Sequence, residues 1–112
     1  MNHNMNLNDR PFEMIKNGEK TIELRLYDEK RRKINVGDTI CFKSGKEKIT
    51  ATVKALHIFR SFEELYAALP LDKCGYTADE LATASPDDML EYYTKEQIEK
   101  YGVVGIEIEV KK

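Results

Sequence analysis

Three charged residues near position 20 have the types and the spacing for ligand binding or acid–base chemistry. Lys20, Glu23 and Arg25 lie within six residues of one another, shortly after Gly18. A lysine removed from water loses proton affinity and can act as a base, whereas a neighbouring carboxylate restores its charge. The planar guanidinium of Arg25 suits a phosphate or the edge of a nucleobase. Alternatively, the three side chains form an exposed ion-pair network that only orders the chain, and such pairs contribute about 0–1 kcal/mol.

A strand must position these side chains, because polar and apolar residues alternate strictly from Thr21 to Tyr27. Successive side chains of a strand lie on opposite faces. Glu23 and Arg25 therefore share a face with Thr21 and Tyr27, and Tyr27 could either stack on a base or pack against the protein. The opposite, apolar face carries Ile22, Leu24 and Leu26. We expect this apolar face to lie against a hydrophobic core.

The only dense cationic run follows this strand and consists of Lys30, Arg31, Arg32 and Lys33. With the lysines of the later segment 43–48, it could follow a phosphate backbone. The alternative is an ordinary solvated loop. As a binding hypothesis, the run adds four residues to the candidate ligand site formed by Lys20, Glu23, Arg25 and Tyr27.

Composition narrows the possible classes of protein. The chain has 112 residues, 18 basic and 20 acidic side chains, and a net charge of −2. This length predicts one domain over residues 1–112. Because the charge is balanced, no global field attracts nucleic acid or membrane, and any anion binding must be local.

The cysteines and histidines argue against a metal site. Cys41 and Cys74 form no CxxC pair, and His3 and His57 are the only histidines. No metal and no organic cofactor is therefore expected. His57 falls on an apolar strand face, which predicts a core histidine bonded to a backbone carbonyl. The polar N-terminus lacks a signal sequence and no apolar run could span a membrane, so we expect a cytoplasmic protein without a membrane partner.

The remaining periodicity predicts an α+β protein. An extended start precedes a helix from Asp9, and strands are expected over residues 39–43, 49–59 and 104–110. Residues 61–101 read as a helical insertion of three or four short helices, since capping-box patterns begin at Ser61, Thr77 and Thr94. Five or six strands with short turns are compatible with a small, partly open β-barrel.

The chain resembles the ASCH family, the activating signal cointegrator homology domain. The resemblance rests on a G-x-K-x-x-E-x-R pattern, met by Gly18, Lys20, Glu23 and Arg25, and on a later turn at Gly37-Asp38. It implies a PUA-like, partly open β-barrel with flanking helices. It also implies a cleft lined by the motif residues that binds RNA or a nucleoside- or nucleotide-containing ligand.

The resemblance leaves an enzymatic alternative open. Some small bacterial relatives resemble metal-free amidohydrolases that remove the acetyl group of acetylcytidine with a lysine, a threonine three residues later and a glutamate. Lys20 matches the lysine, but Glu23 stands at the threonine position, and Thr21 lies two residues earlier. Lys20, Glu23 and Thr21 would be the catalytic residues under this hypothesis. A third alternative is a protein-interaction module.

Overall fold

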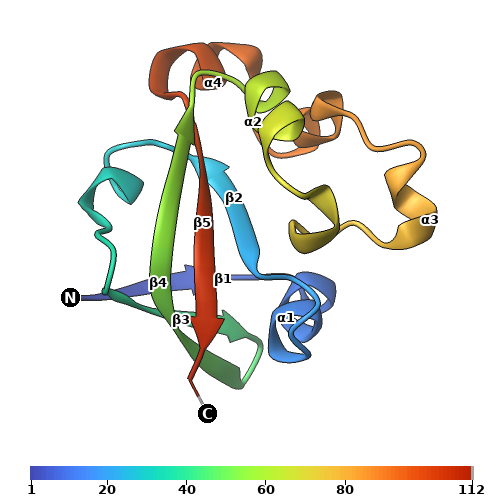
Figure 1. The fold of residues 1–112 in the computed structure, drawn as a ribbon. Coiled ribbons are helices and arrows are strands. Elements are labelled where there is room, and N and C mark those ends of the chain that lie inside the picture. Colours follow the sequence, from blue (N-terminus) through green and yellow to red (C-terminus); the bar gives the residue numbers. More distant parts are fainter. Residues whose placement is uncertain (112) are drawn as a thin grey trace.

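Five strands form a single curled sheet in the computed structural model, which describes residues 1–111. The strand order is β1-β3-β4-β5-β2. The strands are β1 (Asn2–Asn6), β2 (Ile22–Leu26), β3 (Thr39–Ser44), β4 (Glu47–Phe59) and β5 (Val103–Val110). The sheet curls into a half-barrel that stays open between its two edge strands, β1 and β2 (Figure 1). The predicted α+β class and partly open barrel are confirmed, with five strands.

Helices lie at three places along the chain. Helix α1 (Asp9–Lys16) connects the edge strands, the short helix η1 (Arg31–Lys33) lies between β2 and β3, and the segment between β4 and β5 supplies the remaining helices. These are α2 (Phe62–Ala68), η2 (Leu71–Lys73), α3 (Ala78–Leu81), η3 (Pro86–Glu91) and α4 (Lys95–Tyr101). The capping boxes predicted at Thr77 and Thr94 are present, whereas at Ser61 only the serine cap forms, because the Glu64 carboxylate accepts from the Arg60 N–H instead. None of the described helices is both long enough and apolar enough to cross a membrane.

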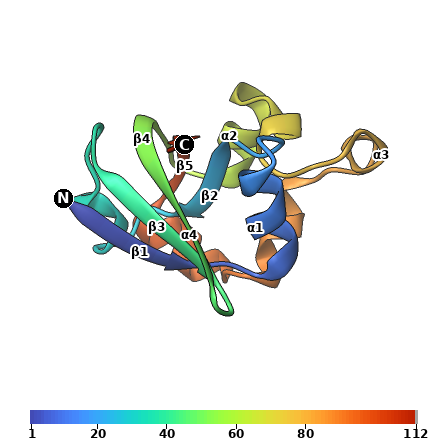
Figure 2. The same ribbon diagram turned by 90° about the horizontal axis from the view of Figure 1, so that it is seen from below.

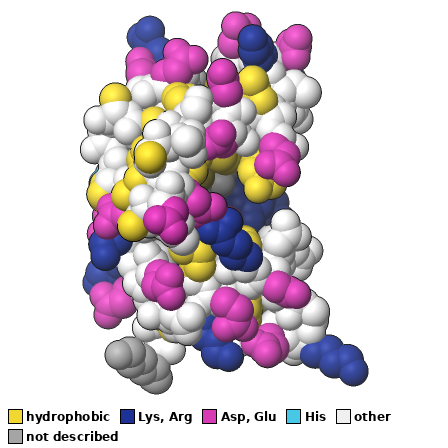
Figure 3. Space-filling model, turned by 90° about the vertical axis from the view of Figure 1, so that its right-hand side faces the viewer, with side chains coloured by type: hydrophobic (Ala, Val, Ile, Leu, Met, Phe, Trp, Pro, Cys, Tyr) yellow, Lys and Arg dark blue, Asp and Glu magenta, His cyan; other side chains and the backbone are white. Residues whose placement is uncertain are grey.

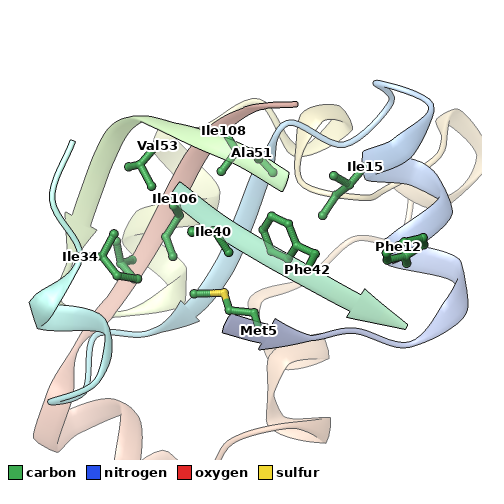
Figure 4. Close-up of a cluster of buried hydrophobic side chains, with 11 residues drawn as sticks. Met5, Phe12, Ile15, Ile34, Ile40, Phe42, Ala51, Val53, Ile106 and Ile108 are labelled. Carbon is green, nitrogen blue, oxygen red and sulfur yellow. The ribbon is translucent and has the colours of Figure 1, made fainter. Parts of the chain in front are cut away.

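Two hydrophobic clusters lie on the two sides of the sheet. The first fills the half-barrel and is closed by Phe12 and Ile15 of α1 (Figure 4). The second lies under the helical segment, which packs beside β2 and covers the outer side of the sheet there (Figure 2). The apolar face of β2 contributes Ile22, Leu24 and Leu26 to this second cluster. The polar face of β2 therefore turns toward the half-barrel, where Tyr27 packs against the first cluster.

A β-bulge in β4 overturns the prediction for His57. The pairing of β4 with β5 shifts register between Val53 and Ala55. An extra residue in one strand reverses the side-chain alternation beyond it, so Val53 and Leu56 both pack on the inner cluster. His57 consequently points outward, with 34% of its side chain exposed, and bonds to Glu107 at 3.1 Å. The predicted core histidine with a carbonyl partner is wrong.

The polar N-terminus is held as an edge strand by one carboxylate. β1 runs parallel to β3, and Asp38, directly before β3, bonds to His3 Nε2 at 2.9 Å and to the Asn35 N–H at 3.0 Å. The N-terminal ammonium lies 3.4 Å from the same carboxylate. The hydrogen bond with His3, then that from Asn35, lowers the pKa of Asp38 from 3.8 to about 2.

Asp38→Asn is expected to reduce stability at neutral pH and to remove part of its acid dependence. Because the folded-state pKa is the lower one, ionised Asp38 stabilises the fold above pH 3.8, and this contribution disappears as the pH falls toward 2. Urea unfolding between pH 2 and 7 measures both effects. Glu29→Gln, which changes an exposed carboxylate, is the control. Parallel pH profiles of the wild type and Asp38→Asn would contradict this role of Asp38.

Candidate ligand-binding cleft

A cleft of about 460 Å³ opens where the half-barrel lacks a strand. The end of β1 and the start of α1 form one wall, β2 forms the floor, and the helical segment forms the opposite wall. Figure 3 looks onto this side of the molecule, where charged and hydrophobic side chains surround a recess. The cleft therefore coincides with the open seam between the two edge strands.

Three motif residues converge at the floor of the cleft, as the sequence predicted. Lys20 Nζ lies 2.7 Å from Glu23 Oε1, and Arg25 Nε lies 2.8 Å from Glu23 Oε2. Only 4% of the Glu23 side chain is exposed, against 10% for Lys20 and 16% for Arg25. Arg25 Nη2 also donates to the Asn6 carbonyl at 3.2 Å, so it bridges β2 to the end of β1. The network thus joins the two edges of the half-barrel.

Glu23 is ionised despite its burial. Burial alone would raise the pKa of its carboxyl, but the charges and hydrogen bonds of Lys20 and Arg25 outweigh burial and lower the pKa. A buried charge is stable only when it is paired and hydrogen-bonded. The floor is therefore a fixed carboxylate held between two cations.

Two glycines shape the path of Lys20. Gly18 follows α1 at φ +82°, a conformation that favours glycine, and the next turn ends with the Lys20 N–H bonded to the Met14 carbonyl. Gly75, at φ +109°, lies against the side chain, because a Cβ there would be 3.4 Å from Lys20 Cδ. Gly18 belongs to the sequence motif, whereas the contact of Gly75 with Lys20 was not predicted.

The helical segment adds an aromatic wall that the sequence motif does not include. Tyr66 and Tyr76 join their hydroxyls at 2.6 Å, and the Tyr76 hydroxyl donates to Asp88 at 2.8 Å. Burial, followed by these hydrogen bonds, raises the pKa of Tyr76, so its hydroxyl stays protonated as a donor. Tyr92 and Tyr93 also line the cleft. The capping patterns of the segment do not indicate which tyrosines face β2.

The cleft has little free positive charge. Arg10, at the start of α1, forms an ion pair with Glu80 of α3 across the mouth. Three cations and four carboxylates line the cleft, namely Arg10, Lys20 and Arg25 with Glu23, Glu80, Asp88 and Glu91. Each of the three cations is paired with one of these carboxylates. The cleft therefore presents hydrogen-bonding groups rather than an electropositive surface.

Cys74 is a buried neighbour of this network. Burial raises the pKa of its thiol to about 11, although the charge of Lys20 opposes the effect. A protonated thiol is a poor nucleophile and a poor metal ligand. Among the residues that the structure describes, no group of three or more His, Cys, Asp or Glu side chains could hold a metal ion.

The other predicted ligand residues do not reach this cleft. Tyr27 and Arg32 line a second, more open hollow, with the Arg32 guanidinium 4.4 Å from the centre of the Tyr27 ring. Arg32 also donates to the Tyr101 carbonyl, and Arg31 is paired with Asp28 at 3.2 Å. Lys30 and Lys33 are exposed beside them. Thr21 precedes β2 and does not line either hollow.

Glu23→Gln is expected to destabilise the fold strongly, because two largely buried cations lose their carboxylate. Removing one partner of a buried ion pair costs about 3–5 kcal/mol. Since the pKa of Glu23 is lowered, its stabilisation is complete above the unfolded-state pKa and disappears as the pH falls through the folded-state value. Urea unfolding at pH 7 and at acidic pH measures both effects. Glu107→Gln, on the adjacent strand and 44% exposed, is the matched control. Equal losses in the two variants would show that the network at the floor is not specially stabilising.

Comparison with known proteins supports the resemblance drawn from the motif. The family model of the ASCH domain matches residues 5–112. The crystal structure of the hypothetical protein PH0355 is similar, with a TM-score of 0.84 and 38% identity over 99% of this chain and 100% of that one. The solution structure of PF0455 from Pyrococcus furiosus has a TM-score of 0.73 and 39% identity over 98% and 97% of the two chains. No curated protein shows a significant match. The chain belongs to the ASCH domain family.

Proposed function

We propose that this protein binds RNA or a nucleotide-like ligand, and that a nucleobase occupies the cleft above Lys20, Glu23 and Arg25. The observation that carries the proposal is the buried network of these three side chains at the floor of an aromatic-walled cleft. A volume of about 460 Å³ falls within the size of ordinary small-molecule sites. Membership of the ASCH family, which is thought to bind RNA, points in the same direction.

The pairing of the cations favours a base over a phosphate at the floor. A phosphate would have to compete with Glu23 for Lys20 and Arg25, and it would meet the other carboxylates of the lining. A neutral base brings donors and acceptors without that repulsion. In this arrangement Glu23 accepts from an amino group, Arg25 donates to a carbonyl oxygen and Lys20 fixes the charge of the carboxylate.

Phosphates of the same ligand would lie outside the cleft. Lys30 and Lys33 are exposed on the loop after β2, and Arg32 covers the ring of Tyr27. Exposed cations beside an aromatic ring suit the backbone and bases of a single strand. We therefore assign to Tyr27 and to the run from Lys30 to Lys33 an accessory role in contacting flanking nucleotides.

The competing function is that of a metal-free amidohydrolase. The observation that favours it is that Lys20 lines the cleft. Lys20 reaches the cleft, but its ammonium donates to Glu23 at 2.7 Å, whereas a general base needs a free lone pair. Thr21 does not line the cleft. Chemistry at an acylated cytidine would thus require Lys20 to leave Glu23 first.

Removing either cation of the cleft is expected to weaken RNA binding by about tenfold or more, since hydrogen bonds of charged groups contribute about 1.5–3 kcal/mol. Fluorescence anisotropy with a short labelled single-stranded RNA compares the wild type with Lys20→Met and Arg25→Met. Lys54→Met, on the exposed face of β4, is the control and should bind like the wild type. Equal affinities for all four proteins would refute a binding role for the cleft, once circular dichroism has shown that the variants are folded.

The same variants distinguish the proposed binding function from the amidohydrolase and from the protein-interaction module. Chromatography after incubation with acetylcytidine should detect no cytidine; turnover that Lys20→Met abolishes would establish the amidohydrolase instead. RNA binding should weaken with rising salt, and further on neutralising Arg31 and Arg32. RNA binding that is absent, or independent of salt, would favour the protein-interaction module.

A further inference from the structure

The edge of β2 that faces away from β5 carries unpaired backbone groups. In an antiparallel pair, residues that exchange hydrogen bonds alternate with residues that do not. The Tyr27 N–H donates to Gly102 and the Ile108 N–H donates to Thr21, and both pairs fit the β2–β5 register. The odd-numbered residues of β2 therefore bond to β5. The N–H and C=O groups of the even-numbered residues point to the open seam.

Leu24 is the residue whose free backbone groups open into the cleft. It lines the cleft, whereas Ile22 and Leu26 do not. Ile22 and Leu26 have the same orientation in the register, so their backbone groups also point away from β5. Within residues 1–111, no hydrogen bond found in the structure engages the Leu24 N–H or C=O. An unpaired donor and acceptor thus lie side by side next to Glu23 and Arg25.

The free edge at the cleft is too short to bind a peptide as an additional strand. A peptide that adds to a sheet edge needs several consecutive free residues. Here Leu26 does not line the cleft, and the side chain of Arg25 crosses the seam to Asn6. At the other end, the cleft is bounded by Lys20 packed against Gly75. One free residue at the cleft is too short for a strand but matches the edge of a planar heterocycle.

We infer that the Leu24 backbone N–H and C=O read the Watson–Crick edge of a nucleobase seated in the cleft. Such an edge offers an adjacent donor and acceptor: a ring N–H with a carbonyl, or an amino group with a ring nitrogen. The base would lie in the seam, at the edge of β2 where a further strand would otherwise pair, with Glu23 and Arg25 beside it. This inference rests on the proposed function and specifies which atoms of the ligand are recognised.

The free protein provides the first test. In amide hydrogen exchange followed by NMR, the Leu24 N–H should exchange at least tenfold faster than the N–H groups of Glu23 and Arg25, which bond to β5. Equal protection of the three amides would overturn the inference, because Leu24 would then already have a partner.

Ligand titration provides the second test. Uridine and guanosine 5′-monophosphates are compared with their 3-methyl and 1-methyl counterparts, which lose the ring N–H of the Watson–Crick edge. The unmodified nucleotide that binds more tightly should shift the Leu24 amide and slow its exchange, and its methylated counterpart should bind at least tenfold more weakly. For uridine, 5-methyluridine monophosphate controls for the added methyl group and should bind normally.

The contrary outcomes are distinguishable. Binding that leaves the Leu24 amide unchanged, or equal affinity for the methylated nucleotides, overturns the inference but leaves the proposed function standing. No binding of either nucleotide, or of short RNA, overturns both. A Leu24 amide that responds to an extended valine–threonine peptide and to neither nucleotide would identify the edge as a peptide site.

Discussion

The buried carboxylate of Glu23 is the constraint on which the site depends. A negative charge with 4% of its side chain exposed persists only because Lys20 and Arg25 both reach it. The same requirement fixes the geometry of the surroundings. Lys20 must pass Gly75, and Arg25 must lie where it also meets the Asn6 carbonyl. One charged group thereby links the strand, the turn before it, the helical segment and the far edge of the sheet.

The incomplete barrel leaves room for a cleft beside this network. A closed barrel would pair β1 with β2 and leave no room between them, whereas here the seam is crossed by the side chain of Arg25. The helical segment contributes the aromatic wall opposite, and α1 seals the inner cluster below. Unpaired backbone at an edge strand is usually a hazard for aggregation. In this fold Leu24 of the free edge lines the cleft, beside the side chain of Arg25 that crosses the seam.

The sequence predicted those features that depend on neighbouring residues. Strict alternation located β2, and the capping boxes at Thr77 and Thr94 located two helix starts. The family motif indicated that Glu23 and its cations converge. Features that depend on distant contacts were not predictable: the tyrosine wall arises from packing of the helical segment on β2, and the bulge that turns His57 outward is not marked by any local residue type. For the same reason, the run from Lys30 to Lys33 could not be placed relative to the cleft.

A crystal structure of the protein with a bound nucleoside monophosphate tests the central claim most directly. The account predicts the base in the seam between β1 and β2, within hydrogen-bonding distance of Glu23 and of the Leu24 backbone, with its phosphate directed out of the cleft. A nucleotide bound instead in the hollow of Tyr27 and Arg32, with the seam empty, would contradict it. A phosphate inserted between Lys20 and Arg25 in place of Glu23 would contradict it as well.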